Sequence, residues 1–502
     1  MAGNREIFKQ AGIYAFSAQA TQLITLIASI LSRRFLGPLQ VGIWATLQII
    51  VEYAKYSNLG AVYSVAREVP YYIGKGQKKI AEEIQNIVFT TTFTSSSVIA
   101  FGIIAYALLF RNRLSREISY GLFFVAAIVI LQRMNDLLIS LLRSYKQFTL
   151  ASKQILWSAV VNVVLVGAFT YYYKIYGFMW AIGLSLLFNI AYILVKSDLK
   201  LRFHFEPKRF KSIITFSFPL LLIGILTTIF RSIDRILVAK LMGFKALGFY
   251  SIGMMVCSYL STIANSSTIV LVPHLQEKFG NRDDPRDLNE LLHKAGYILS
   301  FTLPILIGSA WILIPIFVSL LLPQFIPAVP AVQYLSLSVF SITLSQPYSD
   351  FLITIKKHIL LFPILGISSL CTFLLFSWLI KSGYGIEWVA ATVSAANLVV
   401  FSVIYFVSAK YLANRALTLK SYLINVGCFA YLLIVLYLIN FLFISNNNLF
   451  LVTALKLIVF YTAFFPLLLI LNRKFHLLQF VKSKLQKRLP RQINPDTGIS
   501  PL

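Results

Sequence analysis

Apolar runs long enough to cross a membrane recur along almost the whole of this 502-residue chain. A membrane-spanning helix needs about 20 apolar residues, because the hydrocarbon core of a bilayer is about 30 Å thick. The runs predict about fourteen such helices. They lie near residues 11–32, 41–66, 85–110, 117–143, 150–173, 176–196, 213–237, 245–273, 295–322, 328–354, 358–380, 385–409, 420–444 and 448–472. The sequence therefore predicts an all-α polytopic membrane protein with no room for a sizeable soluble domain.

The strongly basic balance of the chain, a net charge of +27, is explained by this topology. In a soluble protein such an excess would suggest nucleic acid. Here Lys and Arg concentrate on one side of the predicted spans by roughly three to one, and basic loops stay in the cytoplasm, next to anionic lipid. We therefore expect a multi-pass protein of the cytoplasmic (inner or plasma) membrane, with both termini in the cytoplasm and no nucleic-acid partner.

Residues that commonly carry catalysis or bind metals are scattered. Cys257, Cys371 and Cys428 lie far apart inside apolar runs, and the five histidines form no cluster with ligand spacing. The chain also has no phosphate-binding loop of the ATPase type. We therefore expect no metal, no cofactor and no enzyme activity.

An internal repeat divides the chain. The segment RRFLGPLQVGIW (33–44) matches AKLMGFKALGFY (239–250) at an offset of 206 residues, with two glycines in register. A weaker match joins SLLRSYKQF (140–148) to DFLITIKKH (350–358). The matches predict a six-helix lobe over 1–210, a second over 211–415, an extra helix pair over 416–472 and a basic cytoplasmic tail over 473–502. Repeated bundles of this kind are typical of alternating-access transporters, in which one repeat rocks against the other.

Charged residues inside the predicted spans indicate a polar cavity. A charge at the middle of a helix costs about 2.5–3.5 kcal/mol on the insertion scale, so such residues usually face a cavity and have partners. The candidates for binding an anionic group are Arg34, Lys55, Arg133, Arg231, Arg235 and Lys240. The candidates for ion coupling or for pairing with these cations are Glu52, Asp136, Asp234 and Asp350. Because cations outnumber acids, the cavity favours an anionic cargo such as a diphosphate. Any single pair can equally be an ion pair that only fastens two helices.

Three segments resemble the bacterial polysaccharide and O-antigen flippases. They are RRFLGPLQVGIWATLQ (33–48), NLGAVYSVAREVPYYIGKG (58–76) and FSFPLLLIGILTTIFRSIDRILVAKLMGFKALGFYS (216–251). The resemblance extends over about residues 5–410 and rests on hydropathy and on Gly, Pro and charged positions. That family is part of the larger superfamily that includes lipid II flippases and multidrug/toxin extruders.

The resemblance implies two six-helix lobes forming a V, and an undecaprenyl-diphosphate-linked oligosaccharide as cargo, moved from the inner to the outer leaflet. It further implies that helices within 420–472 form a groove for the lipid tail, and that carboxylates such as Asp234 are candidates for ion coupling. Partners would be membrane lipid, the lipid-linked glycan, and a polysaccharide polymerase or glycosyltransferases. Two other functions stay open: a multidrug or toxin extruder, and a membrane glycan polymerase or ligase, which the short outer loops disfavour.

Overall fold

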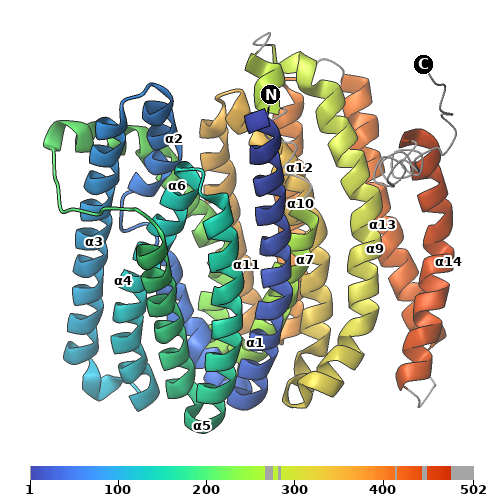
Figure 1. Cartoon of the computed structure of the whole chain (residues 1–502). Coiled ribbons are helices and arrows are strands. Elements are labelled where there is room, and N and C mark those ends of the chain that lie inside the picture. The colour runs from blue at the N-terminus through green and yellow to red at the C-terminus, as the bar shows by residue number, and fades with distance from the viewer. Residues whose placement is uncertain (1, 266–274, 281–283, 413–414, 444–448, 476–502) are drawn as a thin grey trace, which may run out of the picture. The chain divides into compact units, whose positions relative to one another are not determined.

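The computed structural model describes residues 2–265, 275–280, 284–412, 415–443 and 449–475. Within these ranges the chain forms helices and no strand, which confirms the all-α prediction (Figure 1). The main helices are α1 (Ala2–Ala54), α2 (Ala61–Gly74), α3 (Lys78–Leu109), α4 (Arg116–Ser144), α5 (Phe148–Lys196), α6 (Pro207–Leu237), α7 (Phe244–Asn265), α9 (Asn289–Leu321), α10 (Val329–Thr354), α11 (Leu361–Lys381), α12 (Ile386–Ala409), α13 (Arg415–Leu442) and α14 (Leu449–Phe475). Residues 476–502 of the expected basic tail lie outside the described residues.

By length and composition, the described residues contain 11 candidate membrane spans, or 12 if the bent pair Pro207–Thr215 and Ser217–Met242 is one span. The expected number of about fourteen is therefore approximate. Part of the difference between the predicted and the observed number of spans lies in α1 and α5, which have 53 and 49 residues. Each contains one residue with non-helical backbone angles, Gly37 in α1 and Lys174 in α5.

The helix α5 folds back on itself at Lys174. Asn162 Nδ2 donates to Ser185 Oγ at 3.3 Å, although a straight helix would hold these residues about 34 Å apart. The helix α1 folds back at Gly37 in the same way, because Ser29 and Glu52, which would also be about 34 Å apart in a straight helix, line one cavity. Each of these helices therefore consists of two arms, which the apolar pattern predicted as separate spans.

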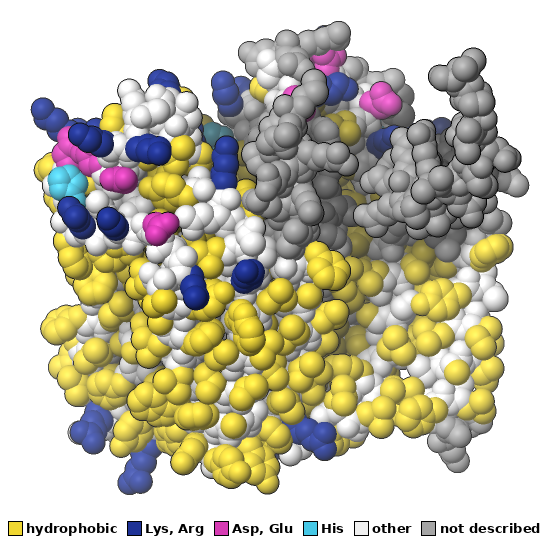
Figure 2. All heavy atoms as spheres, viewed as in Figure 1, with side chains coloured by type: hydrophobic (Ala, Val, Ile, Leu, Met, Phe, Trp, Pro, Cys, Tyr) yellow, Lys and Arg dark blue, Asp and Glu magenta, His cyan; other side chains and the backbone are white. Residues whose placement is uncertain are grey.

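Hydrophobic side chains form a broad band over α3, α4 and α5, and Lys and Arg side chains gather above and below it (Figure 2). A band of this kind faces lipid tails, and the charged rims reach the headgroups. The protein is thus a multi-pass membrane protein.

The Cα positions divide the chain into two compact units. The first comprises residues 1–266 and 314–408, and the second comprises 267–313 and 409–502. Inside the second unit, Ser300 Oγ donates to Asn425 Oδ1 at 2.9 Å between α9 and α13. The boundary near residue 210 between two six-helix lobes stays a prediction.

Backbone geometry supports the internal repeat within the first unit. Gly37 has φ 71 and ψ 173, and Gly243, its counterpart 206 residues later, has φ 88 and ψ 172. This conformation is nearly restricted to glycine. The weaker sequence match, of 140–148 with 350–358, shows the same agreement. Its corresponding residues Lys146 and Lys356 have left-handed φ values of 59 and 60.

The linker between α5 and α6, residues 197–206, is extended and lies along α3. Side chains of α3 satisfy its backbone at every second residue. Gln85 Nε2 donates to Lys200 O at 3.0 Å. The backbone N–H groups of Arg202 and His204 donate to Asn86 Oδ1 and Thr90 Oγ1 at 3.0 and 2.9 Å. The linker is thereby tied to α3.

Candidate functional site

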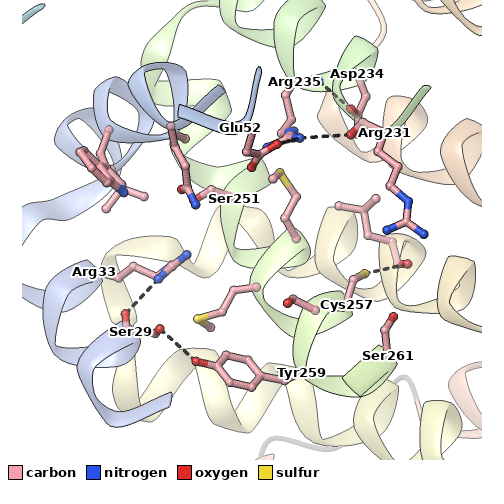
Figure 3. A pocket seen from close by; sticks show the side chains of 18 of the residues that line it. Ser29, Arg33, Glu52, Arg231, Asp234, Arg235, Ser251, Cys257, Tyr259 and Ser261 are labelled. Carbon is pink, nitrogen blue, oxygen red and sulfur yellow. Dashed lines mark hydrogen bonds and ion pairs between the residues drawn. The ribbon is translucent and has the colours of Figure 1, made fainter. Parts of the chain in front are cut away.

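A cavity of about 810 Å³ lies in the first unit and is lined by residues of both repeats. Six charged residues line it: Arg33, Glu52, Lys55, Arg231, Asp234 and Arg235. Figure 3 shows five of them around the same space. With four cations and two carboxylates, the charged lining has an excess of two positive charges. This agrees with the net cationic cavity expected from the sequence.

A bidentate ion pair in the cavity joins Arg235 of α6 to Glu52 of α1. Arg235 Nη1 donates to Glu52 Oε1 at 2.8 Å, and Nη2 donates to Oε2 at 2.6 Å. The guanidinium is nearly buried, at 7% exposure, whereas Glu52 is 31% exposed. A bidentate pair of this kind is fixed in direction as well as in distance. It holds the two repeats together at one wall of the cavity.

The second carboxylate of the cavity, Asp234, is also fully engaged. Tyr250 Oη donates to Asp234 Oδ2 at 2.6 Å, and the backbone N–H of Arg235 donates to Oδ1 at 2.8 Å. Asp234 and Tyr250 are both buried. Both lining acids are therefore occupied by protein donors, and neither is presented as an open anionic site.

Two other lining cations, Lys55 and Arg231, form no ion pair within the described residues. Lys55 Nζ lies over the ring of Tyr56, 4.7 Å from its centroid. In Figure 3 the guanidinium of Arg231 stands apart from the Glu52–Arg235 pair. These two side chains can therefore receive an anion without breaking an existing salt bridge.

At the repeat offset, charged lining residues of the cavity correspond to uncharged lining residues. Every one of the five charged residues Glu52, Lys55, Arg231, Asp234 and Arg235 has a counterpart 206 residues away that also lines the cavity, and each counterpart is uncharged. In the same order these counterparts are Ser258, Ser261, Thr25, Ala28 and Ser29. We call the first set the charged half of the cavity and the second set, together with the neighbouring lining residue Tyr259, the hydroxyl half.

Each repeat contributes one tyrosine whose hydroxyl contacts a serine hydroxyl of the other repeat. In the hydroxyl half, Tyr259 Oη and Ser29 Oγ are 3.1 Å apart. Ser29 corresponds to Arg235, and the counterpart of Tyr259 is Tyr53, whose Oη lies 2.8 Å from Ser232 Oγ. Ser232 itself corresponds to Leu26, so the two corresponding tyrosines contact different positions of the opposite repeat.

Of the ten residues predicted from the sequence, the structure brings five together at this cavity: Glu52, Lys55, Arg231, Asp234 and Arg235. Arg34 and Lys240 are exposed and are absent from the lining. Successive residues of a helix point about 100° apart, so Arg33 faces the cavity whereas its neighbour Arg34 faces outward.

The other three predicted residues are also absent from the lining. Arg133 and Asp136 pair with each other on α4, with Arg133 Nη2 and Asp136 Oδ2 2.9 Å apart. Asp350 of α10 accepts a hydrogen bond from Gln346 Nε2 at 3.0 Å. These contacts correspond to the local pairing that the sequence left open.

The ten candidates named for anion binding, ion coupling or pairing did not include Arg33 or the neutral residues of the hydroxyl half. Charge alone cannot detect Ser29, Ser258 or Tyr259. The 206-residue offset of the repeat could have identified them, because it makes Ser258 the sequence counterpart of Glu52. For metal binding, no group of three or more His, Cys, Asp or Glu side chains is close enough within the described part of the chain.

The comparisons with known proteins agree with this architecture. A family model described as "Polysaccharide biosynthesis protein" matches residues 30–330. No curated protein matches the chain. Among solved structures, the lipid II flippase MurJ in an inward closed conformation is similar, with a TM-score of 0.67, 16% identity, and coverage of 92% of this chain and 99% of that chain.

Two further structures have the same fold. An inward-facing multidrug resistance MATE family transporter of the MOP superfamily aligns with a TM-score of 0.64 and 15% identity, over 78% of this chain and 94% of that one. A MOP superfamily transporter from Pyrococcus furiosus, described as having a binding pocket of reverse polarity, aligns with a TM-score of 0.59 and 14% identity. The alignment covers 83% of this chain and 96% of that chain. At these identities the likenesses concern the fold alone.

Proposed function

The chain belongs to the family of polysaccharide biosynthesis proteins, and from this membership we propose that it is a flippase for lipid-linked oligosaccharide. Its cargo would be a surface-polysaccharide repeat unit on undecaprenyl diphosphate. The protein would move this unit from the inner to the outer leaflet of the cytoplasmic membrane. MurJ, whose structure is similar, is described as a lipid II flippase.

The division of the cavity into a charged and a hydroxyl half is the observation that carries this proposal. Lipid-linked oligosaccharides have two chemically different parts, a diphosphate and a glycan. Lys55 and Arg231 offer cations to the diphosphate, and cationic groups form the strong, charge-assisted hydrogen bonds that phosphate oxygens accept. Ser29, Ser258 and Tyr259 offer hydroxyls, which both donate to and accept from sugar hydroxyls.

In this mechanism Arg235 is a positioned cation. Glu52 holds its guanidinium in one orientation, so little conformational entropy is lost when a phosphate oxygen approaches. Neutralising the diphosphate lowers the cost of carrying it past the middle of the bilayer. Rocking of the repeats about their contact then exposes the cavity to the other side, while the polyprenyl tail stays in lipid.

The direction and the partners follow from the same proposal. Both termini would be cytoplasmic, because the basic loops would then face the cytoplasm. Glycosyltransferases would complete the cargo on that side, and a polysaccharide polymerase would receive it on the other. Glu52 and Asp234 remain the cavity residues through which an ion gradient could act.

The test is transport of a fluorescent polyprenyl-diphosphate oligosaccharide in proteoliposomes that contain the full chain. Arg231→Gln and Lys55→Gln should each lower the initial rate at least about tenfold, since each removes a charged hydrogen-bond donor. Lys240→Gln and Arg34→Gln are matched controls outside the cavity and should keep the rate within twofold. Full transport by the Arg231→Gln and Lys55→Gln proteins, at normal abundance, would remove the basis of the proposal.

The alternative of a multidrug extruder is favoured by one observation, the similarity to a MATE family transporter. The excess of two positive charges in the cavity disfavours organic cations, because like charges repel in a desolvated site. Overexpression in a drug-sensitive strain separates the two functions. The flippase proposal expects unchanged resistance to ethidium, and resistance that depends on Glu52 or Asp234 would favour the extruder.

A further inference from the structure

We propose that Arg33 forms a binding subsite for an acidic group on the glycan of the cargo, such as the carboxylate of a uronic acid. This inference rests on the proposed function and narrows it, because it assigns the cargo a second anionic group besides the diphosphate. The argument starts from the position of Arg33, which lies apart from the other cavity cations.

Arg33 is in the arm of α1 that contributes Thr25, Ala28 and Ser29 to the hydroxyl half. Its counterpart in the second repeat is Ala239. The charged half therefore lacks an equivalent residue, and Arg33 is a departure from the repeat pattern. Figure 3 shows its guanidinium extending from α1 into the cavity, on the side of Ser29 and Tyr259 and away from the Glu52–Arg235 pair.

The hydrogen bonds of Arg33 within the described residues leave it undersatisfied. Nη1 donates to the carbonyl oxygen of Ser29 at 3.1 Å. Nε is buried and has no hydrogen-bond partner there. No carboxylate of the described residues forms an ion pair with this guanidinium. A cation that faces the cavity with a buried, unpaired N–H and no carboxylate partner is complementary to an anion supplied from outside the protein.

The protein's own acids cannot serve this purpose in the observed arrangement. Glu52 is held by Arg235, and Asp234 is held by Tyr250 and a backbone N–H. The cargo's diphosphate is also engaged, because Lys55 and Arg231 attract it to the charged half. The remaining place for an anion is on the glycan that the hydroxyl half would receive. A planar carboxylate matches the fork of a guanidinium, which donates two parallel hydrogen bonds.

The surroundings of Arg33 suit a sugar ring. Tyr259 and Trp44 line the cavity together with Arg33, and aromatic faces accommodate the apolar side of a sugar. Asn162 of α5 also lines the cavity. It lies one helical turn from Val166, which packs with Ala28 in the same hydrophobic cluster. The cavity thus offers hydroxyl, amide and aromatic groups in addition to Arg33, a combination that suits an acidic sugar.

Binding of two synthetic probes to the purified full chain tests the inference. Both are short-chain polyprenyl-diphosphate disaccharides, one ending in glucuronic acid and the other in glucose. The wild-type protein should bind the glucuronate probe at least about tenfold more tightly, as expected for one charged hydrogen-bonded pair. Arg33→Gln should reduce this ratio to about one and leave the affinity for the glucose probe within twofold.

Three further variants serve as controls. Arg231→Gln should weaken both probes by the same factor, because it would act on the shared diphosphate. Arg33→Lys should retain part of the preference, since it keeps the charge but not the fork. Arg34→Gln, a change at the adjacent exposed residue, should behave like the wild type. Thermal unfolding in detergent identifies any variant that has lost its fold.

The outcomes separate this inference from the function on which it rests. Equal binding of both probes by the wild-type protein would overturn the subsite alone. A similar loss for both probes in Arg33→Gln would overturn it too, because Arg33 would then be supporting the cavity in general. Failure of the wild-type protein to bind either probe would overturn the flippase proposal and the subsite together.

Discussion

Gly42 and Gly248 make the same contact from opposite repeats. A Cβ atom on Gly42 would overlap the carbonyl oxygen of Phe244, and a Cβ atom on Gly248 would overlap the carbonyl oxygen of Pro38. Pro38 and Phe244 are themselves counterparts 206 residues apart. The contact is therefore reciprocal, as it would be across the twofold axis of a dimer. It lies next to the turns at Gly37 and Gly243, where both repeats use the same glycine-specific conformation.

Substitution of either glycine should destabilise the protein. Gly42→Ala and Gly248→Ala place a methyl group against main-chain atoms, which cannot swing away, so we expect a loss of about 1–3 kcal/mol in the free energy of unfolding. Gly183→Ala in α5 is the control, because no atom lies within 4 Å of its added Cβ. Thermal unfolding in detergent measures the effect. Equal midpoints for Gly42→Ala and Gly183→Ala would contradict the close contact.

The Glu52–Arg235 pair should behave as a coupled unit. Glu52→Gln leaves a nearly buried guanidinium without its carboxylate, and we expect it to cost about 1–3 kcal/mol in the free energy of unfolding. In the double variant Glu52→Gln, Arg235→Gln neither charge remains, so it should be more stable than the sum of the single losses predicts. A double-mutant cycle of unfolding free energies measures this. Additive losses would show that the pair contributes no coupling.

Arg133 and Asp136 should affect stability and not transport. They pair with each other on α4 and do not line the cavity. Asp136→Asn leaves the buried Arg133 without its ion pair, which should lower the thermal midpoint while the transport rate per folded molecule stays within twofold. Proteoliposome assays normalised to folded protein separate the two effects. A tenfold lower normalised rate would place this pair in the transport pathway.

Cys257 provides a native probe of the cavity, because it lines the wall and its Sγ donates to the carbonyl oxygen of Leu335 at 3.1 Å. In a protein whose other two cysteines are replaced by serine, a small maleimide should label Cys257, and a polyprenyl-diphosphate glycan should slow the labelling. The matched control is Val51→Cys in a cysteine-free chain. Val51 is the counterpart of Cys257 and is buried without lining the cavity, so its labelling should be much slower. Similar labelling at both positions would argue against the cavity.

The sequence allowed the helices and the repeat to be predicted because both depend on local patterns. Apolar runs identified the arms of α1 and α5, including the breaks at Gly37 and Lys174. The orientation of side chains was harder to predict, since hydropathy does not show which side of a helix faces the cavity. Arg33 and Arg34 demonstrate this, because they are adjacent and only Arg33 lines the cavity. Asp350 was chosen for its charge, although its carboxylate accepts a hydrogen bond from Gln346, a neighbour on its own helix.

The linker of residues 197–206 has a consequence for the evolution of the cavity. A pair of identical, separate half-length chains would place the same side chains on both sides of its twofold axis, so both sides would be charged or both hydroxylic. Joining the halves through one peptide ensures that every molecule contains one copy of each. Within one chain, position 29 can be Ser while position 235 is Arg. The covalent connection thereby permits a cavity with an asymmetric charge distribution. Such a cavity can bind a cargo with two chemically different ends in one orientation.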